Sequence, residues 1–323
     1  MTIKTRRPTG RPSWPITVLA GREGAGKTWA ALSASASPLI GRTLAVTIDE
    51  DSPDEYGAIP GADFEIVDHD GTARGIIATL DEMEKEPDVD GLPTLWVIDS
   101  GGRFWDLLSQ NAQTKANAKK QNSNRTDDSP VSVELWNEAA KQWKQFYDKL
   151  RRHNGPVILT SRLEQVVVMD GHRPTTEREW KIQGYKTLPY DAQVIVEMPE
   201  RGEYLIRKVK STRFTLTKKT PKPDFTMDWL WGVLGLADGA DARTYGGTVP
   251  DPEDAPSDTS GRDWMAELKE AIPMGTSAIA ALGLAAKAAH ADPEKVIEPI
   301  SKAWREVNAK EKAAEAAEQE NAA

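Results

Sequence analysis

Apolar and polar residues follow two different periods along the first 236 residues of the chain. Short apolar runs that are rich in β-branched residues and bounded by turn residues predict buried strands. These runs cover residues 16–20, 43–48, 64–67, 94–100, 156–160, 193–198, 204–209 and 214–216. Apolar residues spaced three and four apart predict helices at 29–34, 72–86 and 133–152. Strands that alternate with helices predict the α/β fold class, with a mostly parallel sheet covered on both faces.

Two segments interrupt this alternation. Residues 109–130 are polar and nearly lack large apolar side chains, which predicts a mobile loop. Residues 166–169 form an apolar run that leads into Asp170-Gly171, and this pair predicts a hairpin turn.

Composition divides the chain into four parts. Residues 1–13 are basic and are expected to be flexible, and residues 14–236 contain the predicted α/β core. Residues 237–262 are rich in Gly, Asp, Pro, Ser and Thr, which predicts a flexible linker. Residues 263–323 are rich in Ala and predict a small helical unit.

The net charge of -9 is unevenly distributed. Residues 237–323 carry 17 acidic and 9 basic residues, so most of the acidity belongs to the C-terminal part. Residues 151–222 carry 15 basic and 8 acidic residues, which predicts a surface that faces an anionic ligand.

The absence of certain residues limits the class of protein. The chain has no cysteine, and its four histidines are scattered, which excludes disulfides and argues against a zinc cluster. It has no apolar run of about 18 residues and no apolar segment behind its basic N-terminus. We therefore expect a cytoplasmic protein that does not contact membranes.

The strongest motif directly follows the first predicted strand. Residues 21–28, GREGAGKT, have the spacing of a phosphate-binding loop, in which glycines let the backbone N–H groups curl around an anion. Lys27 is expected to place its charge between the β- and γ-phosphates of ATP, and Thr28 to bind Mg²⁺. The predicted nucleotide-binding residues are Gly21, Arg22, Glu23, Gly24, Ala25, Gly26, Lys27, Thr28 and Trp29.

Hydrolysis of ATP also requires a metal anchor and a carboxylate that positions the attacking water. Asp99 ends a buried predicted strand and is expected to hold Mg²⁺ through a water molecule. Asp49, Glu50 and Asp51, here called the acidic tip, follow the second predicted strand. Either Glu50 or Asp51 is expected to position the water.

Five segments resemble, in their order, the compact RecA-like ATPases of bacteriophages that are linked to single-strand DNA annealing and recombination. These segments are IDED at 48–51, LWVIDS at 95–100, VILTSRLEQ at 157–165, WKIQGYK at 180–186 and KVKSTR at 208–213. The resemblance covers about residues 14–236 and implies a RecA-like P-loop NTPase core. It also implies that Asp51 falls where the family has its catalytic Glu, with Glu50 as the natural replacement.

The resemblance implies roles for three basic residues. Arg162 falls where the family has a polar residue, often Gln, that senses the γ-phosphate. An arginine can contact phosphate directly, but it cannot act as the family's amide switch. Lys210 and Arg213 match basic residues that reach the nucleotide of a neighbouring subunit, which implies a homo-oligomeric ring or filament.

Two basic segments are predicted to bind single-stranded DNA with little sequence preference, because cations neutralise phosphates and aromatic rings stack on bases. The predicted contacts are Lys115, Lys119, Lys120, Arg125, Arg173, Arg178, Lys181 and Lys186. Trp180 and Tyr185 lie among the second group. The acidic C-terminal unit is expected to bind a protein partner or to compete with DNA for this basic surface.

The leading hypothesis is an ATP-hydrolysing, RecA-like protein that acts on single-stranded DNA in phage recombination, annealing or repair, in the host cytoplasm. A helicase or packaging motor and a nucleotide kinase use the same kind of phosphate loop and remain alternatives. A regulatory module that binds nucleotide without hydrolysis is a further alternative, against which the three carboxylates of the acidic tip argue.

Overall fold

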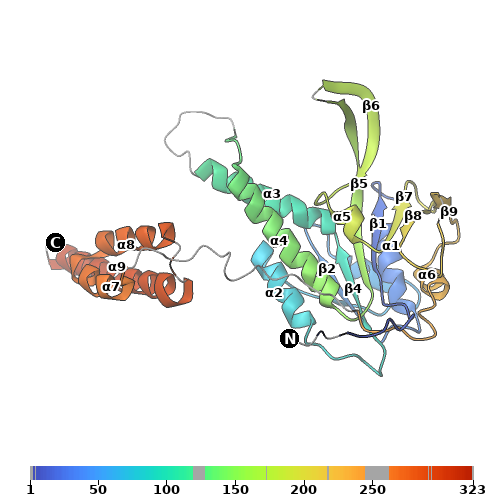
Figure 1. The fold of residues 1–323 in the computed structure, drawn as a ribbon, viewed down its shortest axis with the longest axis horizontal. Helices are drawn as coiled ribbons and strands as arrows, with labels where there is room; N and C mark the ends of the chain where they lie inside the picture. Colours follow the sequence, from blue (N-terminus) through green and yellow to red (C-terminus); the bar gives the residue numbers. More distant parts are fainter. Residues whose placement is uncertain are drawn as a thin grey trace. The chain divides into compact units, whose positions relative to one another are not determined.

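The computed structural model describes residues 3, 5–118, 128–171, 173–216, 218–243, 262–289, 291 and 293–321 (Figure 1). It divides into two units, Met1–Gly246 and Gly247–Ala323. Residues 119–127, for which the sequence predicts part of a mobile loop, lie outside the described residues.

The first unit is built on a nine-stranded sheet in the part of the chain that the structure describes. Its strands are β1 (Ile16–Gly21), β2 (Arg42–Thr47), β3 (Glu65–Ile66), β4 (Thr94–Asp99), β5 (Val157–Asp170), β6 (Arg173–Ile182), β7 (Val194–Met198), β8 (Leu205–Val209) and β9 (Thr220–Pro221). The order is β3-β2-β4-β5-β1-β7-β8-β9, and β6 pairs only with β5. All pairs from β3 to β7 are parallel, whereas β8, β9 and β6 pair antiparallel with their neighbours.

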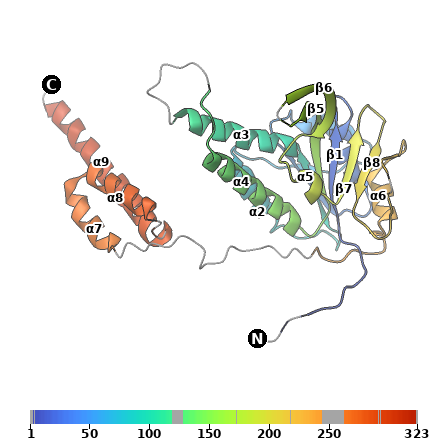
Figure 2. The same cartoon turned by 45° about the horizontal axis from the view of Figure 1, so that its top comes forward.

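Helices cover both faces of this sheet (Figures 1 and 2). The helices of the first unit are α1 (Lys27–Leu32), η1 (Ser33–Ala36), η2 (Pro53–Ala58), α2 (Ala73–Met83), α3 (Gly101–Ala118), α4 (Val133–Arg152), α5 (Leu188–Asp191) and α6 (Met227–Val233). The helices α2, α3 and α4 pack on one face, and α1, η1 and α6 pack on the other. This arrangement confirms the predicted α/β class with a mostly parallel sheet.

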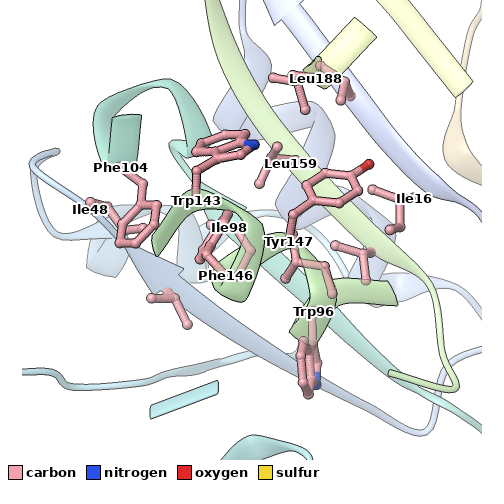
Figure 3. Close-up of a cluster of buried hydrophobic side chains, with 14 of the residues drawn as sticks. Ile16, Ile48, Trp96, Ile98, Phe104, Trp143, Phe146, Tyr147, Leu159 and Leu188 are labelled. Carbon is pink, nitrogen blue, oxygen red and sulfur yellow. The ribbon is translucent and has the colours of Figure 1, made fainter. Parts of the chain in front are cut away.

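Successive residues of the central strands enter different cores, because side chains alternate across a sheet. In β4, Trp96 and Ile98 face α4, whereas Leu95 and Val97 face the α1 side. Figure 3 shows the larger core, in which Trp143 and other aromatic residues of α4 pack on the strands. The bounds of α4 coincide with the helix predicted at 133–152.

The strand β5 continues beyond the sheet as one arm of a hairpin. Its first part pairs with β1 through Arg162, and from Leu163 onward it pairs with β6. The hairpin projects from the sheet (Figure 1), and most residues of β6 are exposed. The predicted hairpin after residues 166–169 is confirmed, because Asp170 pairs with Arg173 across the turn.

Two predictions of secondary structure were wrong. Residues 109–118 are helical rather than a loop, because the small side chains of Ala112 and Ala116 pack against Leu135 of α4. Residues 214–216 do not form a strand, because Phe214 packs edge-on against Trp229 of α6 instead of pairing with β8. The short strand β9 pairs with β8 in its place.

A half-buried arginine holds the last described residues of the first unit. Arg243 donates hydrogen bonds to the carbonyl oxygens of Trp14, Leu150 and Gly155 at 2.6–2.9 Å. Asp241 forms a β-bridge with Ser13. Residues 237–243, which composition groups with the linker, therefore include contacts to the α/β core.

The described residues of the second unit form three packed helices and two short helical segments. These are α7 (Trp264–Ala271), η4 (Ile272–Met274), α8 (Thr276–Ala288), η5 (Pro293–Ile297) and α9 (Glu298–Asn321). Their core includes Trp264, Ile279, Leu282 and Ile300, which confirms the predicted helical character of this region. No helix in the described part of the chain is both long and apolar enough to cross a membrane.

Candidate nucleotide site

The phosphate loop connects β1 to α1 at the carboxyl edge of the parallel strands. Gly24 and Gly26 have φ angles of 68° and 87°, in the left-handed region that favours glycine. These conformations turn the chain sharply before Lys27, the first residue of α1. The loop predicted from its spacing is therefore located between a strand and a helix, as such a motif requires.

Lys27 is hydrogen-bonded to its own loop. Its Nζ donates a hydrogen bond of 2.9 Å to the carbonyl oxygen of Arg22. Burial lowers the pKa of Lys27, while the carboxylates of Asp99 and Glu50 oppose that shift and the charge of Arg162 adds to it. These three predicted site residues are thus close enough to Lys27 to act on its charge.

Thr28 and Asp99 meet across the site. The Thr28 hydroxyl donates a hydrogen bond of 2.6 Å to Oδ2 of Asp99, and Thr160 of β5 donates to Oδ1 of the same carboxylate. Asp99 is 7% exposed, so its orientation is fixed on both sides. A hydroxyl and a carboxylate side by side are oxygen donors of the kind that Mg²⁺ prefers, and these residues fit the predicted metal.

The acidic tip is held by two arginines. Glu50 accepts from Nη2 of Arg162 at 2.8 Å and lies 3.6 Å from Nε of Arg103. Asp49 has a φ of 51° and lies 3.2 Å from Nη1 of Arg103. Asp51 is exposed. The structure therefore brings Glu50, and not Asp51, into the charged network of the site.

A cavity of about 420 Å³ opens beside the phosphate loop. Besides the predicted loop residues, including Trp29, it is lined by Tyr56, Arg201 and Tyr204, which sequence reasoning missed. Arg201 lies in the turn between β7 and β8, next to the loop because β7 pairs with β1. A turn with a basic residue after a predicted strand is visible in the sequence, but the pairing that brings it to the loop is not.

Lys210 and Arg213 lie at the opposite edge of the sheet from the phosphate loop. The backbone N–H of Lys210 donates to the carbonyl oxygen of Gln193 at 2.8 Å, directly before β7 begins. Both side chains line a cavity of about 540 Å³ together with Arg11. The structure thus separates these two residues from Lys27 within one chain.

The predicted DNA contacts are distributed over three places. Arg173, Arg178 and Lys181 lie on β6, and Lys186 follows it. Lys115 lies on α3, where it forms an ion pair with Glu138 of α4. The remaining predicted contacts, Lys119, Lys120 and Arg125, lie outside the described residues.

The hairpin and the phosphate loop contact each other. The guanidinium carbon of Arg22 lies 4.3 Å from the centroid of the Trp180 ring on β6. Arg22 also forms an ion pair of 2.5 Å with Glu200, in the turn after β7. The predicted nucleotide-binding residue Arg22 therefore joins the loop to two neighbouring elements.

Comparison with solved structures gives similarities at low sequence identity. The RadB recombinase is 19% identical with a TM-score of 0.36, covering 61% of this chain and 81% of that chain. A DnaB-like replicative helicase is 13% identical with a TM-score of 0.37, covering 64% and 54%. An ATPase from a bacterial type III secretion system is 13% identical with a TM-score of 0.30, covering 57% and 50%. This chain thus spans about half the length of the last two proteins.

The family comparison is more direct. No curated protein matches the chain. Residues 15–222, which include the phosphate loop, Asp99 and the β5–β6 hairpin, match the family model described as an AAA domain. This chain is therefore a P-loop ATPase that belongs to the AAA domain family.

Proposed function

We propose that the protein binds and hydrolyses ATP with Mg²⁺ and couples this reaction to single-stranded DNA, in phage recombination, annealing or repair in the host cytoplasm. The observation that carries the enzymatic part is the 2.6 Å hydrogen bond between Thr28 and Asp99, beside Lys27. A hydroxyl and a half-buried ammonium at the start of α1, with a carboxylate at the end of β4, form a site for a nucleoside triphosphate and its metal.

Each side chain of the site has a distinct task in this proposal. Lys27 leaves the carbonyl oxygen of Arg22 and donates to the β- and γ-phosphates. Thr28 would bind Mg²⁺ and Asp99 would hold it through a water molecule, and the ion would neutralise phosphate charge. Thr160 keeps the Asp99 carboxylate in place.

Glu50 orients the water whose oxygen attacks the γ-phosphorus as the bond to the bridging oxygen breaks. Arg162 is hydrogen-bonded to Glu50, so it can hold this carboxylate and offer its remaining N–H groups to the γ-phosphate. Lys210 and Arg213 act on the nucleotide of a neighbouring copy, because they lie far from the phosphate loop of their own chain. The protein accordingly works as a homo-oligomeric ring or filament.

The DNA-binding part of the proposal is supported by the β5–β6 hairpin. The hairpin carries Arg173, Arg178 and Lys181 on an exposed strand, and its base contacts the phosphate loop through Trp180. One element thus offers cations to a nucleic-acid backbone and touches the nucleotide site. Such an element can couple the binding of nucleotide to the binding of DNA.

Steady-state ATP hydrolysis with and without single-stranded DNA tests the proposal. We expect turnover that requires Mg²⁺ and rises when single strands are added. Turnover that is indifferent to DNA would contradict the coupling, and phosphoryl transfer to a nucleoside monophosphate would indicate a kinase. Separation of a duplex during turnover would favour the helicase alternative.

A further inference from the structure

A groove of about 1090 Å³ lies at the base of the β5–β6 hairpin, between α3, α4 and α5. Four aromatic rings line it, and we call it the aromatic groove. They are Trp105, Trp136, Tyr185 and Tyr190. The nucleotide site does not use these rings.

The rings form a platform that is partly open to solvent. Trp105 lies 4.9 Å from Tyr185 and 6.3 Å from Trp136 between ring centroids, and the two indole planes are inclined by 27°. Trp136 is 41% exposed and Tyr190 is 84% exposed. Large rings gathered in a groove and left exposed are typical of a ligand surface rather than of a core.

Lysines surround these rings. Lys181, Lys186 and Lys208 line the groove, and Lys208 is held in place because its Nζ donates to the carbonyl oxygens of Pro189 and Tyr190 at 2.8 and 2.9 Å. Lys181 has a single ion pair in the described residues, to the exposed Glu179 at 2.9 Å. The lysines are thus available to a polyanion that passes over the rings.

Two carboxyl groups also line the groove. Asp106 accepts a hydrogen bond of 2.7 Å from the Gln183 amide and lies 3.8 Å from Arg103, so its charge is already satisfied within the protein. Burial raises the pKa of both Asp106 and Glu164. The three lysines outnumber these two carboxyl groups in the lining of the groove, which favours an anionic ligand.

We propose that the aromatic groove binds single-stranded DNA by stacking unpaired bases on Trp136 and Tyr190, with the backbone on Lys181 and Lys186. Unpaired bases expose the flat faces that stacking requires, whereas bases in a duplex stack on each other. The groove is continuous with β6, because Lys181 and Ile182 of that strand line it. This inference rests on the proposed function and names the surface that it uses.

The groove is also connected to the nucleotide site. Asp106 at the groove lies near Arg103, and Arg103 lies 3.6 Å from Glu50 of the acidic tip. Asp106 in the lining of the groove is thus two ion pairs away from the carboxylate that is proposed to orient water. This connection gives DNA bound in the groove a route to stimulate hydrolysis.

Two labelled oligonucleotides test the proposal by fluorescence anisotropy. One is a single-stranded thymidine 20-mer, and the other is an abasic strand with the same number of phosphates. We expect Trp136→Ala and Tyr190→Ala each to weaken binding of the thymidine strand about tenfold, since stacking contributes this much per base. Binding of the abasic strand should stay unchanged, because it has phosphates and no bases.

Matched variants separate stacking from folding. Trp136→Phe keeps a ring and should restore most of the affinity, and Trp304→Ala removes an equally exposed indole from the second unit and should have no effect. If Arg178→Ala weakens binding while Trp136→Ala and Tyr190→Ala do not, DNA binding stands and the aromatic groove is not its base-stacking surface. If the full-length protein binds neither strand, both the groove and the DNA-binding function are overturned.

Discussion

Arg22 of the phosphate loop lies over the indole ring of Trp180, with 4.3 Å between the guanidinium carbon and the ring centroid. The backbone carbonyl of the same arginine accepts the hydrogen bond of Lys27. In the proposed function, Lys27 turns toward phosphate and gives up this bond, so we expect nucleotide binding to act on the residue that contacts the hairpin. We therefore expect the base of the hairpin to respond to nucleotide.

Trp180→Ala should weaken the effect of nucleotide on DNA affinity. A cation–π contact of this kind contributes about 0.5–2 kcal/mol, so the ratio of DNA dissociation constants with and without a non-hydrolysable ATP analogue should fall by about twofold to thirtyfold. Trp180→Phe keeps a ring beneath Arg22 and serves as the control. An unchanged ratio in the alanine variant would show that this contact does not carry the coupling.

Lys27→Ala should reduce ATP turnover by about 100-fold or more, because a preorganised charge on the transferred phosphate is lost. Lys85→Ala removes an exposed lysine that pairs with Glu82 and is the matched control. Malachite-green detection of released phosphate measures both variants. Normal turnover by Lys27→Ala would remove the central role of the phosphate loop.

Glu50→Gln and Asp51→Asn distinguish the two candidates for the water-positioning carboxylate. Glu50 acts on the charge of Lys27 and is held by Arg162, whereas Asp51 has no hydrogen bond or ion pair among the residues that the structure describes. We expect Glu50→Gln to lower kcat about 100-fold while ATP still binds, and Asp51→Asn to change kcat less than about threefold. The reverse order would assign the role to Asp51.

Lys210 and Arg213 should act between subunits, which a mixing experiment can detect. The double variant Lys210→Ala with Arg213→Ala and the variant Lys27→Ala should each be nearly inactive alone. In a mixture, the intact phosphate loop of one variant meets the intact cations of the other, and part of the activity should return. Activity that stays at the sum of the two separate samples would contradict a role in trans.

His153 should make the first unit sensitive to acid. Its ring stacks on Trp96 at 3.9 Å, its Nε2 donates to the carbonyl oxygen of Thr94 at 2.7 Å, and burial lowers its pKa from 6.5 to about 3. Because the unfolded chain binds the proton more tightly, the free energy of unfolding should fall by about 2 kcal/mol between pH 7 and pH 5.

The variant His153→Phe keeps the stacked ring without a titrating group. Its free energy of unfolding at pH 7 should be about 1 kcal/mol lower, because the hydrogen bond to Thr94 is lost. This free energy should also depend less on pH than in the unchanged protein. Urea unfolding at both pH values measures the difference between the variants. If the free energy of unfolding depends equally on pH in the two proteins, a group other than His153 causes the acid sensitivity.

Local patterns predicted those parts of the molecule that depend on neighbours in the chain. The phosphate loop and the helix at 133–152 follow from glycine spacing and apolar period, and both are found where they were predicted. Arg103 and Arg201 reach the site only because strand order and helix packing bring distant segments together. The spacing of apolar residues within a segment does not show which distant segments become its neighbours.

The wrong predictions have the same origin. Residues 109–118 lack large apolar side chains, but Ala112 and Ala116 let α3 approach Leu135 closely enough to bury small surfaces. Phe214 lies in a run that predicts a strand, yet it packs on Trp229 from a helix that follows later in the chain. Packing partners, and not intrinsic preference, decided both segments.

The continuity of β5 limits how the hairpin can change in length during evolution. Arg162 and the first hairpin residue, Leu163, are consecutive residues of one strand, with no turn or loop between them. Because side chains alternate with a period of two, adding two residues to each arm lengthens the hairpin and keeps every cation on its original face. Adding one residue to each arm would instead turn all residues beyond the insertion to the opposite face. Homologous hairpins should therefore differ by an even number of residues in each arm, while Arg162 keeps its place in the nucleotide site.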